Sequence, residues 1–169
     1  MGLNARIDLN IGATLTSDFD LTSQGRIPLS VAKAFVLSTG VGAGQGNMLW
    51  FDTRTILASA DDDLDLSGGL TDGFGQPAPF ARVKAMYVYA DPDNINDIRV
   101  GGGGVNSFSS WLGDDTDVVT LTPGGLLLLA TADPVAYVVT PAIGDILRIT
   151  NAAGGSSVVY DIVLFGTSS

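Results

Sequence analysis

Residues 117–166 constrain the fold more than any other part of the chain. They hold four or five short apolar runs that are rich in β-branched residues. Turn-forming residues separate these runs, at Pro123-Gly124-Gly125, Asp133-Pro134, Pro141 and Gly154-Gly155. Short apolar runs divided by Gly and Pro are typical of successive strands with tight connections. This stretch therefore predicts an all-β fold, and nothing in it points to catalysis.

The choice of acidic residue favours strands over helices throughout the chain. All 18 acidic residues are Asp, the chain has no Glu, and 22 of its 169 residues are Gly. Glu and Lys are good helix formers, whereas Asp competes with the helix by bonding to nearby backbone groups. No segment shows a helical period. We therefore expect a single domain over residues 1–169, built from strands and turns.

Residues 3–15 alternate between apolar and polar side chains without interruption. One face carries Leu3, Ala5, Ile7, Leu9, Ile11, Ala13 and Leu15. A period of two predicts one extended strand with a single apolar face. Two interpretations remain open: an edge strand of the same domain, or a docking arm that lies across another chain and adds backbone hydrogen bonds to its sheet.

The charge of the chain argues against several classes of partner. A formal charge of −10 disfavours nucleic acid, which attracts clustered Lys and Arg, and disfavours an anionic membrane surface. Only 15% of the residues are charged, against about 25% in ordinary domains, while 46% are hydrophobic. This balance indicates either a large sheet core or surface that is covered by other chains.

Further along the chain, alternating runs predict strands at 26–38, 48–58 and 82–90. The glycine-rich residues 40–47 match no nucleotide-binding fingerprint, so we expect a flexible hairpin loop that returns the strand at 48–58 beside the strand at 26–38. Residues 82–90 alternate as a half-buried strand does. The runs at 126–129 and 158–165 indicate more fully buried strands.

Three acidic residues at alternate positions, Asp61, Asp63 and Asp65, resemble the start of a calcium-binding loop. Such a loop requires Gly at its sixth position and Glu at its twelfth, where this chain has Leu66 and Asp72. We therefore reject an EF-hand. A different calcium site at residues 61–63 or at Asp91, Asp93 and Asp97 stays open, beside the simpler interpretation that these residues form Asx turns.

The chain offers little for other chemistry. It has no His and no Cys, which removes the usual zinc, haem and iron–sulfur ligands, and no serine has a histidine base. A glycosidase pair from Asp114, Asp115 and Asp117 would lack a preset geometry in a loop. We expect no enzymatic activity, no metal and no cofactor.

Aromatic residues flanked by Gly and Ser, at Phe74, Phe80, Phe108 and Trp111, allow three interpretations. They plug the ends of a sandwich, anchor a protein interface, or stack on a glycan. Phe108 and Trp111 are candidates for contact between subunits.

Several phrases of the chain resemble small structural proteins of tailed bacteriophages and prophages. They are RTILASADDDLDLSGGLTDGFG, FARVKAMYVYA, VGGGGVNSFSSWLGDDTDVVTLTPGGLLLLA and YVVTPAIGDILRITN with VVYDIVLFGTSS. The resemblance runs from about residue 38 to the end, and more weakly before it. It implies a virion component attached to the capsid or to a head or tail appendage, with a jelly-roll or related β-sandwich fold and a dimeric or trimeric assembly.

Together these observations predict a jelly-roll-like β-sandwich of about eight to ten strands, with an extended N-terminal strand or arm at 1–15. The leading functional hypothesis is a capsid decoration or cement protein on the outer capsid surface. It would bind the major capsid protein and itself, with a trimer favoured over a dimer. The residues expected to form the interface are Leu3, Ile7, Leu9, Ile11, Phe108 and Trp111. The alternative is a head-fibre or tail-fibre module that contacts a host receptor or glycan.

Overall fold

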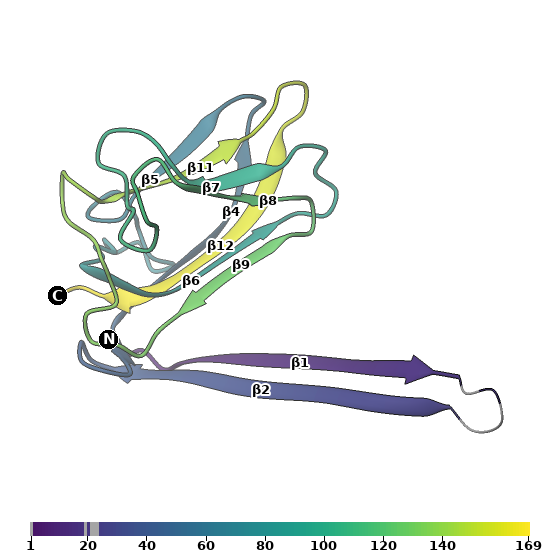
Figure 1. Ribbon diagram of the computed structural model, residues 1–169. Coiled ribbons are helices and arrows are strands. Elements are labelled where there is room, and N and C mark those ends of the chain that lie inside the picture. The colour runs from purple at the N-terminus through teal and green to yellow at the C-terminus, as the bar shows by residue number, and fades with distance from the viewer. Residues whose placement is uncertain (1, 19, 21–23) are drawn as a thin grey trace.

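The computed structural model describes residues 2–18, 20 and 24–169 of the chain. These residues form twelve strands and no helix, which confirms the predicted all-β class (Figure 1). The strands are β1 (Ala5–Ser17), β2 (Gly25–Thr39), β3 (Gln45–Gly46), β4 (Met48–Ile56), β5 (Asp61–Asp65), β6 (Arg82–Ala90), β7 (Ile98–Gly101), β8 (Val118–Leu121), β9 (Leu126–Ala130), β10 (Tyr137–Val138), β11 (Ile146–Asn151) and β12 (Val158–Thr167).

Ten of these strands belong to the body or its margin, and nine of them build two antiparallel sheets that enclose one core. The larger sheet has the order β10-β6-β12-β4, with β9 also paired to β6, and the smaller sheet has the order β5-β11-β7-β8. Buried side chains from both sheets form one apolar cluster that includes Trp50, Met86, Val100, Leu147 and Ile162. The body is therefore a β-sandwich, and the jelly-roll-like topology within this class stays a prediction.

Strand β12 shows how the alternating pattern builds this core. Val158, Tyr160, Ile162 and Leu164 are fully buried between the sheets, while Asp161 between them is exposed on the outer side. Successive side chains of a strand point to opposite faces, so one residue step changes core into surface. Pairing with β4 on one side and β6 on the other places β12 in the interior of its sheet.

The N-terminal strand does not join either sheet of the sandwich. β1 pairs with β2 along its whole length, from Ala5 opposite Leu37 to Ser17 opposite Gly25. The two strands form a long antiparallel hairpin that extends away from the body (Figure 1). The strand therefore pairs within its own chain, at the edge of a separate hairpin and not of the sandwich, and docking of this hairpin on another chain stays a prediction.

The hairpin is anchored to the body at its base. Ala5 and Leu37 are buried there, and the Thr39 hydroxyl donates a hydrogen bond of 2.8 Å to the Leu3 carbonyl oxygen. Lys84 of β6 is fully buried, and its ammonium group donates to the carbonyl oxygens of Gly42 and Asp133. Burial lowers the pKa of Lys84. These contacts tie the loop after β2 to the larger sheet.

The predicted return of residues 48–58 alongside residues 26–38 is wrong. β4 pairs with β12 along its length, and β2 pairs with β1 and, through two residues, with β3 in parallel. Trp50 and Ile56 of β4 are 6% and 2% exposed. Burying these two large side chains requires a place in the sandwich, which the projecting hairpin cannot provide.

Two predictions of burial also need correction. β9 is less buried than its run of leucines indicated, because it pairs on one side only and Leu126 is 53% exposed. β6 is more buried than its alternation indicated, because Val83, Lys84, Ala85 and Met86 are all covered. The strand count exceeds the predicted eight to ten because β3 and β10 are two-residue strands without a sequence pattern.

Candidate docking surface

The hairpin presents one apolar face, which we call the hairpin face. Directly opposite residues of an antiparallel pair lie on the same side of the ribbon. The register therefore gathers on one side Ala5, Ile7, Leu9, Ile11, Ala13 and Leu15 of β1 with Ile27, Leu29, Val31, Lys33, Phe35 and Leu37 of β2. Apart from Val36 and Pro28, the other side carries polar or small residues such as Arg6, Asp8, Asn10, Ser30 and Ala32.

The hairpin face becomes more exposed toward its tip. On β1 the exposed fraction rises from 36% at Leu9 to 48% at Ile11 and 69% at Leu15. On β2, Leu29 is 53% exposed and Ile27 is 68% exposed. Single exposed apolar residues are ordinary, but a contiguous exposed apolar patch marks an interaction surface. A two-stranded ribbon is also marginally stable by itself, so a covering partner would stabilise it.

A second apolar surface lies on the outer side of the larger sheet, and we call it the outer sheet face. The registers align its residues in three rows across four strands. The rows are Leu126-Tyr89-Asp161-Thr53, Leu128-Tyr87-Val163-Phe51 and Ala130-Ala85-Phe165-Leu49. Phe51 is 59% exposed, and Tyr87, Leu128, Val163 and Phe165 are half-buried.

The two faces meet at the base of the hairpin. Ile7 of the hairpin face lines an apolar pocket of about 250 Å³ together with five residues of the outer sheet face. Those residues are Ala85, Tyr87, Leu128, Val163 and Phe165. At the base of the hairpin, Ile7 and the outer sheet face are therefore the two walls of one apolar pocket.

The apolar surface continues past β4 into a groove of about 630 Å³. Leu49 and Phe51 of the outer sheet face line it, together with Leu3 and with Phe74, whose side chain is 80% exposed. Leu3, one of the residues predicted to form the interface, therefore lies beside this groove, next to the base of the hairpin.

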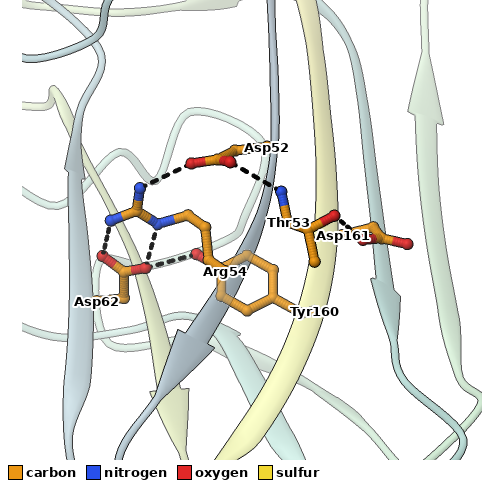
Figure 2. A network of polar contacts seen from close by, with 6 residues as sticks. All are labelled: Asp52, Thr53, Arg54, Asp62, Tyr160 and Asp161. Atoms are coloured by element: carbon orange, nitrogen blue, oxygen red, sulfur yellow. Dashed lines mark hydrogen bonds and ion pairs between the residues drawn. The ribbon is translucent and has the colours of Figure 1, made fainter.

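Each face contains one charged residue, and the two charges have opposite signs. Lys33 lies opposite Leu9 in the middle of the hairpin face and is exposed. Asp161 lies in the outer sheet face, where its carboxylate accepts a 2.6 Å hydrogen bond from the Thr53 hydroxyl (Figure 2). Burial, followed by the Asp161 charge, raises the pKa of Tyr87. Within the described residues Lys33 has no ion-pair partner.

A polar network near Asp161, also drawn in Figure 2, has a structural role. Arg54 of β4 forms two hydrogen bonds with the Asp62 carboxylate of β5, at 2.5 and 3.0 Å. The hydroxyl of the buried Tyr160 donates to the same carboxylate at 2.9 Å. Because β4 and β5 belong to different sheets, this network links the two layers of the sandwich at their margin.

The Tyr160 phenol makes stability sensitive to high pH. Burial and then the neighbouring Asp62 charge raise its pKa, so the phenol stays neutral in the folded state. An unfolded tyrosine ionises near pH 10, so stability is constant below that value and falls as pH rises above it. Between pH 9 and pH 11, we expect the free energy of unfolding of the parent to fall by about 1.4 kcal/mol more than that of Tyr160→Phe. Urea unfolding at the two pH values measures this; equal losses in both proteins would contradict it.

The structure separates the six predicted interface residues into two groups. Leu3, Ile7, Leu9 and Ile11 lie on the hairpin or at its base, and the last two are exposed. Phe108 is 1% exposed within the core, so its side chain is not available to a partner. Trp111 packs against the core and donates its indole N–H to the Phe108 carbonyl oxygen at 3.0 Å. The burial of Phe108 and Phe80 and the packing of Trp111 against the core favour a structural role for these aromatics over contact with a partner or a glycan.

Sequence reasoning missed the half of the hairpin face that β2 supplies. Ile27, Leu29, Val31, Phe35 and Leu37 alternate as clearly as the residues of β1 do. Their spacing alone could have identified them as a second apolar strand face. The sequence contains no local signal for the outer sheet face, because strands from four separate parts of the chain build it.

The acidic clusters are occupied by internal contacts. Arg148 binds the Asp63 carboxylate at 2.7 Å, and Asp91 accepts a backbone N–H from Asp93 as an Asx turn does. Hydrogen bonds from the Thr116 backbone and hydroxyl lower the pKa of Asp114. Nowhere in the described part of the chain do three or more acidic side chains converge as metal ligands.

These features define a class: an all-β sandwich with a projecting hairpin that has one exposed apolar face. Searches against known protein families, curated proteins and solved structures found no match. Among the described residues there is no helix of the length and hydropathy needed to cross a membrane.

Proposed function

We propose that this protein is a structural component of a bacteriophage particle, a capsid decoration or cement protein on the outer surface of the head. The phage setting rests on the sequence resemblance. The assembly role rests on one observation, the projecting hairpin whose apolar face is exposed over most of its length. A folded chain that leaves such a surface uncovered is suited to bury it against a partner.

The proposed mechanism is reinforcement by several linked contacts. A cement protein binds where capsid subunits meet, and each of its contacts can be modest. Once one contact has formed, the others act at a high effective concentration, so the assembly holds more tightly than any single contact. A rigid sandwich with a long arm suits this role because it fixes the distance between its contact points.

The alternative, a fibre module that contacts a receptor or glycan, has less support. It relied on exposed aromatics in the loop that carries Phe108 and Trp111, and Phe108 is buried in the core. The two functions differ in location and copy number. Hundreds of copies over the head surface favour cement, whereas a few copies at the tail favour receptor contact.

Shortening the hairpin tests the proposal. The variant replaces residues 11–31 with Asn-Gly, which closes a two-residue turn onto the paired positions Asn10 and Ala32. We expect this protein to stay folded and β-rich by circular dichroism and to keep its melting temperature, because the sandwich core is untouched. We expect it to lose co-sedimentation with heads built from the major capsid protein. A matched control, Ser30→Asn on the polar side of the hairpin, should bind as the parent does. A decoration role would be contradicted if the parent protein did not bind heads, or if the labelled protein were found only at the tail of the particle.

A further inference from the structure

We propose that the hairpin face binds the outer sheet face of a second copy of this chain, so that the protein assembles by exchanging hairpins. The inference deepens the proposed function by naming the partner of the hairpin. The decoration role is tested by binding to capsid heads, whereas self-assembly is tested on the purified protein alone. One proposal can therefore fail while the other holds.

The first argument is that both faces are apolar and belong to the same chain. The hairpin face is covered by Ile, Leu, Val, Phe and Ala around one Lys. The outer sheet face is covered by Leu, Phe, Tyr, Val and Ala around one Asp. Each protomer therefore exposes both halves of a contact, and a copy that offers its hairpin also offers a sheet to receive one.

The second argument is the matching charge. Lys33 is the one charged residue of the hairpin face, and Asp161 is the one charged residue of the outer sheet face. A charge surrounded by apolar side chains is costly to bury unless an opposite charge meets it. Docking the two faces brings a cation from one copy to an anion of the other and leaves neither buried alone.

The third argument is the distribution of the remaining charge. A formal charge of −10 makes two copies repel each other over most of their surfaces. The two faces together carry one Lys and one Asp, so this repulsion is absent where they meet. A basic partner would instead be drawn to the acidic parts of the surface, away from both faces.

The fourth argument is size. The exposed part of the hairpin covers nine paired positions, from Leu9 to Ser17, which at about 3.3 Å each make about 30 Å, so its face covers roughly 300 Å² at a ribbon width of about 10 Å. One exchanged hairpin would be a small contact. Two, one donated and one received, reach about 600 Å² for each partner, or about 1,200 Å² in total, which is the lower end of the range for specific interfaces. The groove beyond Phe51 and toward Phe74 lengthens the receiving surface.

The chain cannot make this contact with itself in the structure described. Its hairpin runs away from the larger sheet, and Ile7 at the base is the hairpin residue that lines the shared pocket (Figure 1). The exposed part of the hairpin face, from Leu9 to Leu15, is therefore not covered by its own chain and is available to the outer sheet face of another copy. A reciprocal dimer and a closed ring both satisfy this arrangement.

The test is a charge exchange read out by sedimentation velocity on purified protein without capsids. We expect the parent to be oligomeric, and Lys33→Asp and Asp161→Lys each to raise the dissociation constant at least about tenfold. The double variant Lys33→Asp/Asp161→Lys should return to within about threefold of the parent because the pair is restored with its signs reversed. The control Ala34→Asp adds the same carboxylate one residue away on the polar side, and it should change little.

A cross-linking experiment identifies the two surfaces directly. The chain has no Cys, so introduced thiols are the only ones present. A Leu29→Cys chain mixed with a Phe51→Cys chain should form a heterodimer with a short bis-maleimide, and Ser30→Cys in place of Leu29→Cys should not. A monomeric parent, an unrestored double variant, or a Leu29→Cys/Phe51→Cys chain that cross-links only within itself would overturn the inference.

Discussion

Replacing Gly166 with Val should lower the free energy of unfolding by roughly 3 kcal/mol or more, beyond the usual cost of overpacking a core. Gly166 lies in β12 where the pairing with β6 shifts register. A Cβ atom there would lie 2.1 Å from the Arg82 carbonyl oxygen and 2.7 Å from a ring carbon of Phe80. The backbone of β6 cannot yield without breaking the central pairing of the larger sheet. Urea unfolding followed by circular dichroism measures the loss.

Gly12 of β1 provides the matched control for this prediction. It is also a strand glycine, but a Cβ added there meets no atom within 4 Å. Gly12→Val should leave the unfolding of the sandwich unchanged, since valine suits a strand and the position is open. If both variants unfold at the same urea concentration, the close approach of β6 to Gly166 is not a constraint on the fold.

Replacing Asp62 with Ala should lower the free energy of unfolding by about 2–3 kcal/mol. The carboxylate accepts hydrogen bonds from Arg54 and from the buried Tyr160 hydroxyl (Figure 2). Its removal leaves the phenol without a partner inside the protein, and it leaves a partly buried guanidinium with only Asp52. An unsatisfied buried polar group costs more than the net value of the bond that it lost. Thermal and urea unfolding at pH 7 measure the effect.

Asp52 tests whether this loss comes from burial and not from the ion pair as such. It binds the same Arg54 at 3.1 Å, but its side chain is 45% exposed. Exposed ion pairs contribute about 0–1 kcal/mol, so Asp52→Ala should be nearly neutral. A loss from Asp52→Ala equal to that from Asp62→Ala would show that the Tyr160 contact does not matter.

These two predictions concern the sandwich, whereas the proposed assembly depends on the hairpin. The division has a practical consequence: changes on the hairpin face should alter association without altering the unfolding of the body, and changes at Gly166 or Asp62 should do the reverse. A chain built in this way keeps its folded core apart from the hairpin face that we propose as a contact surface.

Much of the secondary structure was predictable because strand periodicity is a local property. The strands at 26–38 and 82–90 were found nearly to the residue, and the apolar face of residues 3–15 was found as well. The burial of β9 was overestimated because a run of leucines shows hydrophobicity, but it does not show whether a strand lies at an edge of its sheet.

The candidate docking surface was predictable only in part. Ile7, Leu9 and Ile11 were identified from their alternation, and the equally regular face of β2 was read only as a strand. Phe108 was judged a contact residue because Gly and Ser flank it, yet its side chain lies in the core. Flanking residues describe the backbone of a loop and carry no information on where the loop packs.

The order of residues alone was enough to establish an all-β chain, an apolar strand at its start and the absence of His, Cys and Glu, because composition and short-range alternation require no knowledge of distant contacts. Three-dimensional pairing established the rest. It joined β1 to β2 as a projecting arm, aligned Asp161 with Thr53 and Phe51 with Val163, and set Lys33 and Asp161 on two separate apolar faces. Those relations depend on which distant strands share backbone hydrogen bonds, and a period of two residues is the same whichever partner a strand finds.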